Sequence, residues 1–121
     1  MVAALITLAM YLNREKTALE TLPQDATNVV RHRLSPNYFC EFYTSETGFR
    51  TWVDSQTDPV MGPVSQQVSS ILRWNPSSKE TYLYRIENAL VADWTGEQPD
   101  EGQHMVYDLA TRKAYFWYHS R

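Results

Sequence analysis

The sequence predicts an α+β fold, in which an N-terminal helix packs on a curved, hairpin-rich antiparallel β-sheet of six or seven strands. The chain has 121 residues, which is the size of one domain. Apolar residues follow helical spacing up to Pro23 and alternate with period two beyond it. A turn motif followed by an aromatic run occurs three times, which is typical of β-hairpins. We therefore expect one domain over residues 1–121, with a helix at 2–21 and an antiparallel sheet within 28–119 that could close into a partial barrel.

The N-terminal helix is predicted by leucines spaced three or four residues apart, and Pro23 ends it. Its first three turns are apolar on nearly all sides, which implies burial on more than one side. The apolar stretch at 2–12 is too short to cross a bilayer, which takes about 20 residues. It also lacks the basic start of a signal peptide, so a buried helix is favoured over membrane association, and a trimmed membrane anchor is the alternative. Leu5, Leu8, Leu12 and Leu19 are expected to contact the sheet, whereas Ile6 and Met10 are expected to contact a protein partner or a second protomer.

The turn motif places a short polar residue, then Thr, Ser or Gly, then alternating aromatic residues. Residues 74–84 align without gaps on residues 107–117, and residues 43–52 form a looser copy. We expect turns at 45–48, 75–79 and 108–112. The predicted strands are 28–34, 38–44, 49–54, 66–74, 80–92, 103–108 and 113–119.

Two of these strands have a helical alternative. Ser77 and Glu80 could form a capping box for a helix over 80–92, and the apolar spacing in 64–72 also fits a short helix. The β-rich composition of 80–92 favours a strand. Residues 95–102 are predicted to form an exposed acidic loop.

Alternation along the strands divides their side chains between two predicted faces. The predicted core face collects most of the aromatic residues, and the opposite face carries most of the charges. Because of this division, Trp117→Ala is expected to destabilise the protein more than Trp52→Ala. The core face is predicted to hold Leu72, Trp74, Tyr82, Tyr84, Ile86, Met105, Tyr107, Tyr115 and Trp117. The opposite face is predicted to hold Arg50, Arg73, Arg85, Glu87, His104, Trp52, Leu83, Phe116 and Tyr118.

The predicted core face uses tyrosine where a plain core would use Phe or Val. A buried phenol requires a hydrogen-bond partner. Several hydroxyls on one face therefore indicate a wet cavity, a ligand pocket or an aromatic platform, and the alternative is that they emerge at the rim of the sheet. The candidate ligand-binding or partner-binding residues are Tyr82, Tyr84, Tyr107, Tyr115 and Trp117, together with Ile6 and Met10.

Composition and motifs exclude several classes of function. The net charge of −3 argues against nucleic-acid binding. Glycine-rich nucleotide loops and zinc-protease motifs are absent from the sequence, which predicts no cofactor and no metal site. The single cysteine, Cys40, excludes an internal disulfide and predicts a buried, inert thiol in a reducing cytoplasm. His32, His104 and His119 lie on three predicted strands without motif spacing, so we expect them to be structural or exposed to solvent.

The function predicted from these features is that of a non-catalytic binding or accessory module that uses an aromatic face or pocket. Its expected partner is a protein, a second copy bound through the N-terminal helix, or a small apolar ligand. One alternative is a small hydrolase or isomerase with a histidine-containing cavity. Another is a subunit of a larger assembly, docked through the N-terminal helix. Histidines that converge in an enclosed pocket would favour the enzyme, and scattered histidines would favour the binding module.

Overall fold

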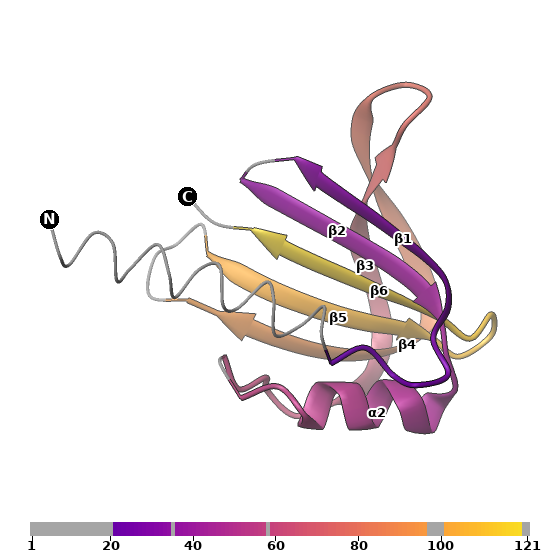
Figure 1. Ribbon diagram of the computed structural model, residues 1–121, viewed down its shortest axis with the longest axis vertical. Helices are drawn as coiled ribbons and strands as arrows, with labels where there is room; N and C mark the ends of the chain where they lie inside the picture. The colour runs from indigo at the N-terminus through magenta and orange to yellow at the C-terminus, as the bar shows by residue number, and fades with distance from the viewer. Residues whose placement is uncertain (1–20, 35, 58, 97–100, 120–121) are drawn as a thin grey trace, which may run out of the picture.

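The computed structural model describes residues 21–34, 36–57, 59–96 and 101–119, which form one antiparallel sheet and one helix (Figure 1). The helix, α2 (Glu46–Asp54), follows the second strand and packs against one face of the sheet. The strand order across the sheet is β1-β2-β6-β5-β4-β3. The strands are β1 (Thr27–Leu34), β2 (Asn37–Tyr43), β3 (Ser65–Asn75), β4 (Glu80–Thr95), β5 (Gly102–Asp108) and β6 (Lys113–His119).

The α+β fold expected from the sequence is wrong, because the described part of the chain is mostly antiparallel sheet and its one helix is not N-terminal. The sheet has six strands and is open, with β1 and β3 at its two edges, so it does not close into a partial barrel. The predicted helix at 2–21, with Ile6 and Met10, lies outside the described residues except for Thr21, which is in a turn. Among the described residues, no helix is long and apolar enough to cross a membrane.

Helix α2 occupies the segment where the sequence predicted a turn at 45–48 and a strand at 49–54. Ser45 caps the helix, because its side-chain oxygen accepts a hydrogen bond of 3.0 Å from the backbone N–H of Gly48. Phe49, Trp52 and Val53 then point into the core at helical spacing. The polar residue that suggested a turn therefore starts a helix instead.

The other two hairpins are confirmed, with turns at 75–79 and 108–112. Asn75 Oδ1 accepts a hydrogen bond of 2.9 Å from the N–H of Ser77, and Asp108 Oδ1 accepts one of 2.9 Å from the N–H of Ala110. Each turn ends on a residue with positive φ, Lys79 at 55° and Arg112 at 63°. Residues 64–72 and 80–92 lie mainly in strands, so their helical alternatives are wrong.

The register of the hairpins overturns the predicted division into faces. In the β5–β6 hairpin, Met105 pairs with Phe116 and His104 pairs with Trp117. Paired residues share a face, so the odd-numbered residues of β5 lie on the same face as the even-numbered residues of β6. The prediction placed odd-numbered residues of both strands, such as Met105 and Trp117, on one face and thereby mixed the two faces. In addition, β4 has one extra residue relative to β3 between Ile86 and Ala89, and this bulge reverses the alternation within β4.

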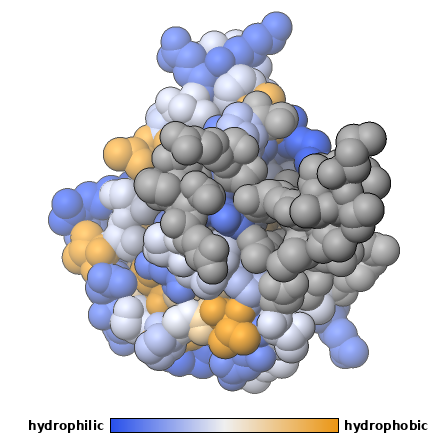
Figure 2. All heavy atoms as spheres, turned by 90° about the vertical axis from the view of Figure 1, so that its left-hand side faces the viewer, coloured by the Kyte–Doolittle hydropathy of each residue, from blue (hydrophilic) through white to orange (hydrophobic). Residues whose placement is uncertain are grey.

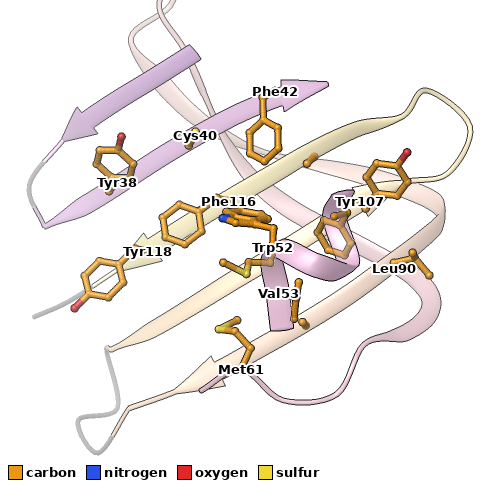
Figure 3. Close-up of a cluster of buried hydrophobic side chains, with 14 residues drawn as sticks. Tyr38, Cys40, Phe42, Trp52, Val53, Met61, Leu90, Tyr107, Phe116 and Tyr118 are labelled. Atoms are coloured by element: carbon orange, nitrogen blue, oxygen red, sulfur yellow. The ribbon is translucent and has the colours of Figure 1, made fainter. Parts of the chain in front are cut away.

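We call the side of the sheet that carries α2 the helix face, and the other side the outer face. The main core lies on the helix face (Figure 3). It consists of Tyr38, Cys40, Phe42, Phe49, Trp52, Val53, Met61, Leu90, Ala92, Met105, Tyr107, Ala114, Phe116 and Tyr118. The second cluster, on the outer face, contains Ile71, Ile86, Ala89, Val91, Val106 and Tyr115, with Tyr84 and Trp117 packed against it.

Trp52 lies at the centre of the main core, although it was predicted on the charged side of a strand. Only 1% of its surface is exposed. Its ring lies between Phe42 and Phe116, with centroids 5.1 and 6.0 Å away (Figure 3). Trp117 is only partly buried. The expected order of the two tryptophan substitutions is therefore reversed.

Candidate functional site

The predicted site residues divide between the two faces of the sheet. Tyr115 belongs to the outer-face cluster, and Tyr84 and Trp117 pack against it. Tyr82 lies on the same side, near the start of β4. Tyr107 is buried on the helix face, where its hydroxyl donates a hydrogen bond of 2.9 Å to the backbone oxygen of Thr44. The tyrosines therefore do not converge on one cavity. Ile6 and Met10 lie outside the described residues.

The three outer-face tyrosines surround Arg73 of β3. Its guanidinium carbon lies 5.7, 5.0 and 5.2 Å from the ring centroids of Tyr82, Tyr84 and Tyr115. These distances are typical of cation–π contacts. The aromatic platform predicted from the sequence is therefore occupied by a side chain of the protein itself.

Arg73 also forms two hydrogen bonds of 2.7 Å with the carboxylate of Glu41 on β2. Lys113 of β6 binds the same carboxylate at 3.0 Å. Strands β6, β5 and β4 lie between β2 and β3 in the sheet, so this contact requires β3 and β4 to cross back over the outer face (Figure 1). We call this paired strand unit the β3–β4 ribbon, and the contact of Arg73 with Glu41 the ribbon clamp.

Burial and charge oppose each other at the ribbon clamp. Burial raises the pKa of Glu41, but hydrogen bonds and positive charge from Arg73 and Lys113 outweigh burial and lower that pKa overall. Burial also raises the pKa of the Tyr115 phenol, against the opposing charge of Arg73. Glu41 is therefore ionised and Tyr115 neutral at pH 7, which is the charge state that the clamp requires.

A second polar cluster crosses the outer face on β4, β5 and β6. Asp93 Oδ1 lies 2.7 Å from Nδ1 of His104, and Nε2 of His104 lies 3.1 Å from Nε2 of His119. In the neutral tautomer that donates Nδ1–H to Asp93, the Nε2 atom of His104 carries a lone pair. That lone pair can accept a hydrogen bond from Nε2–H of His119. We call these three residues the histidine cluster.

Trp117 and Gly102 set the position of the two imidazoles. The Trp117 ring centroid lies 4.9 Å from that of His104 and 4.5 Å from that of His119. Its Nε1 atom donates a hydrogen bond of 3.1 Å to Asn37 Oδ1. A Cβ atom at Gly102 would lie 2.6 Å from Nε2 of His119 and 3.3 Å from Nε2 of His104. Glycine at this position therefore leaves the space in which the imidazoles meet.

The histidine cluster can hold and transfer a proton, but its surroundings do not resemble an enclosed active site. Asp93 and His104 have 50% and 26% of their side-chain surface exposed. Cys40 is buried on the helix face, and burial raises the pKa of its thiol to about 11, which leaves it un-ionised at pH 7. His32 is on β1, opposite Phe39 of β2, and not in the cluster. Two of the three histidines therefore converge, on an open face.

The solvent side of the β3–β4 ribbon carries a further group of side chains. Leu72 pairs with Leu83 across the ribbon, and Trp74 is two residues along the same side from Leu72. None of the three belongs to either buried cluster or packs against one. We call Leu72, Trp74 and Leu83 the ribbon patch. Leu72 and Trp74 were predicted to lie in the core, but both are partly exposed.

A groove of about 480 Å³ lies beside α2 and is partly lined by Leu22, Asp25, Trp52 and Ser55. None of the predicted site residues that the structure describes lines this groove. On the side of the molecule shown in Figure 2, the described hydrophobic atoms form small separate patches, and the tip of the β3–β4 ribbon is hydrophilic.

The histidine cluster was not predicted because its members lie on three strands without motif spacing. One signal was available, which is the register set by the predicted turn at 108–112. If Asp108 pairs with Lys113 across this turn, His104 pairs with Trp117 and Gly102 pairs with His119. Counting outward from the predicted turn would have placed His104 and His119 on one face. Comparison of the chain with known protein families, with characterised proteins and with solved structures finds no match.

Proposed function

We propose that the protein is a non-catalytic binding module that engages a protein partner through the ribbon patch. The observation that carries this proposal is the exposure of Leu83, which has 71% of its surface accessible beside the partly exposed Leu72 and Trp74. Apolar groups that pack on no core are typical of surfaces that bind another protein. Tryptophan is also among the residues that contribute most binding energy at such interfaces.

The ribbon clamp supports this proposal because it attaches the side of the ribbon that faces the sheet, and so holds the ribbon in place. On the side of the ribbon that faces the sheet, Arg73 binds Glu41. On the same side, Ile71 is buried in the outer-face cluster and Tyr84 packs against it. The opposite side is thereby presented to solvent on a fixed support. A preformed surface loses less conformational entropy on binding than a mobile one.

The charges near the ribbon patch favour a protein over a nucleic acid. Arg85, close to the patch on β4, is paired with Glu87 at 2.8 Å, so its charge is balanced. The whole chain carries a net charge of −3. A polyanionic partner would instead require a positively charged surface. The single buried cysteine supports a reducing compartment, and we propose the cytoplasm.

Photo-crosslinking in the native cells tests this proposal. Benzoylphenylalanine in place of Leu83 is expected to give a discrete covalent adduct, whereas the same group in place of the exposed Asp54 on α2 gives none. Trp74→Ala is expected to reduce the adduct about fivefold or more, in line with the loss of an interface anchor. Ser70→Ala, on the same side of the ribbon, is the control and should leave it unchanged.

The outcome also identifies the kind of partner. An adduct of twice the mass of the chain would show that the partner is a second copy. Equal labelling from positions 54 and 83, or an adduct that Trp74→Ala leaves unchanged, would contradict the proposal.

A further inference from the structure

We propose that His104 and His119 form a binding site for a divalent transition-metal ion, with Zn²⁺ as the probe. This site is independent of the ribbon patch and was not expected from the sequence. The proposal rests on the geometry of the two Nε2 atoms, on the contact of Asp93 with His104, and on the space left by Gly102.

The two Nε2 atoms have nearly the separation that a shared metal ion requires. They lie 3.1 Å apart. Two nitrogen ligands at tetrahedral zinc, each bonded at 2.0–2.1 Å, are about 3.3 Å apart. The ring planes differ by 12° and the ring centroids are 5.2 Å apart, so the two imidazoles are nearly parallel, with their Nε2 atoms within hydrogen-bond distance. Binding would require the rings to rotate so that both lone pairs point to one ion.

Asp93 provides the support that metal-binding histidines usually have. Its carboxylate lies 2.7 Å from Nδ1 of His104, on the side of the ring away from His119. Such a carboxylate fixes the tautomer that leaves Nε2 available and raises its basicity as a ligand. For His119 to bind through Nε2, its proton moves to Nδ1, so the neutral pair accepts the ion without net release of a proton.

Gly102 provides the space between strands. Its Cα faces His119 in the β5–β6 register, and a Cβ there would lie 2.6 Å from Nε2 of that histidine. This atom would also lie 3.3 Å from Nε2 of His104, so it would crowd both nitrogens. Trp117 supports both rings by packing against them.

The ion expected here is one that prefers nitrogen ligands. Imidazole suits Zn²⁺, Cu²⁺ and Ni²⁺, whereas Mg²⁺ and Ca²⁺ prefer oxygen. In the described part of the chain, no group of three or more His, Cys, Asp and Glu side chains is placed to hold a metal ion. The site therefore supplies two ligands, and water or a donor from a partner fills the remaining positions.

Isothermal titration calorimetry of the full chain with ZnCl₂, and with MgCl₂ as the control ion, tests this inference. We expect one Zn²⁺ per chain and no heat from Mg²⁺. His119→Gln and His104→Gln should each weaken Zn²⁺ binding at least tenfold. Asp93→Asn should weaken it about 10-fold or more while leaving both ligands present. His32→Gln is the matched control and should bind Zn²⁺ as the wild type does.

Gly102→Ala provides a variant that changes no ligand, and it should also lose Zn²⁺ binding. Circular dichroism establishes whether each variant folds. If a histidine variant fails to fold, Asp93→Asn and the rise in melting temperature of the wild type with Zn²⁺ decide the question. No binding of Zn²⁺ by the wild type, or equal binding by His119→Gln, would show that the two imidazoles form only a hydrogen bond. Equal binding by Asp93→Asn would contradict the supporting role given to that carboxylate.

Discussion

Glu41 connects three strands that are not all neighbours in the sheet. Its carboxylate on β2 binds Arg73 of β3 through two hydrogen bonds and Lys113 of β6 through one ion pair. Only 16% of its side-chain surface is exposed. A partly buried charge with two cationic partners is costly to leave uncompensated, so the clamp depends on the ionised state of this one residue.

Replacing Glu41 with Gln is expected to destabilise the protein by about 2–3 kcal/mol at pH 7, because Arg73 then loses its buried counter-ion. The folded-state pKa of Glu41 is lowered, so its contribution is present above the ordinary value of 4.5 and is lost as the pH falls through the lowered folded-state value. Urea denaturation from pH 7 to pH 3 should therefore show the wild type and Glu41→Gln converging below about pH 4.5.

Glu87→Gln is the control for this measurement. Glu87 also pairs with an arginine, Arg85, but both side chains are largely exposed. Exposed ion pairs contribute little to stability, so no measurable change is expected at either pH. A constant difference between the wild type and Glu41→Gln across the whole pH range would contradict the role given to the Glu41 charge.

The two tryptophans Trp52 and Trp117 give a second test at the scale of single residues. Trp52→Ala is expected to lower the free energy of unfolding by about 3–5 kcal/mol, because it empties the centre of the main core. Trp117→Ala should cost about 1–2 kcal/mol, since that ring is only partly buried. Guanidinium denaturation monitored by circular dichroism measures both. A larger loss in Trp117→Ala would show that the outer face, rather than the helix face, holds the main core.

At the scale of elements, the start of α2 is fixed by contacts outside the helix. Thr44 donates a hydrogen bond of 2.5 Å to Asp25 Oδ1, and the N–H of Ser45 donates one of 3.1 Å to Asp25 Oδ2. The hydrogen bonds from Thr44 and Ser45 also lower the pKa of Asp25. Asp25 thus ties the segment before β1 to the junction between β2 and α2, which orients the helix on the sheet.

Gly48→Ala is expected to destabilise the protein by about 1–3 kcal/mol, although alanine has the higher helix propensity. A Cβ atom at position 48 would lie 2.7 Å from Asp25 Oδ1 and would also overlap Thr44 Oγ1. Thr47→Ala, at the exposed neighbouring position, should be neutral or slightly stabilising. Thermal denaturation of the two variants checks the pair. Increased stability in Gly48→Ala would show that Asp25 can move away without loss.

At the scale of the whole molecule, the β3–β4 ribbon reaches from one edge of the open sheet back to β2. Its pairing with β5 is continuous from Ala89 to Thr95, whereas its far half contacts the rest of the sheet through the ribbon clamp and the outer-face cluster. The bulge between Ile86 and Ala89 lies between these halves and changes the direction of β4. The ribbon is therefore a separable unit whose position depends on the clamp.

Arg73→Met is expected to increase amide hydrogen exchange about tenfold or more in residues 71–75 and 80–84, because the far half of the ribbon loses its attachment. Exchange in β5 and β6 should not change. Arg85→Met, which alters an exposed arginine of the same ribbon, is the control and should leave both regions as in the wild type. Equal increases throughout the sheet would show that the ribbon is not a separate unit.

The sequence by itself determined six of the seven predicted strands and two of the three predicted turns. Asn75 and Asp108 direct their side chains to backbone N–H groups two residues later, and this short-range chemistry needs no tertiary contact. The same short-range chemistry was ambiguous at Ser45, which can begin a turn or cap a helix. Burial of Phe49 and Trp52 against the sheet favours the helix.

Only the tertiary structure decided which side chains share a face. A one-residue change of register moves every side chain of a strand to the opposite side of the sheet. The bulge in β4 causes such a change within that strand. In the β5–β6 hairpin, odd-numbered residues pair with even-numbered ones, which also reverses assignments based on alternation alone. The meeting of His104 with His119, and of Arg73 with Glu41, follows from that register and from the return of β3 across the sheet. The histidine contact lies within one hairpin, so it follows once the register of that hairpin is known. The contact of Arg73 with Glu41 joins strands that are not neighbours in the sheet, and local sequence patterns carry no information about it.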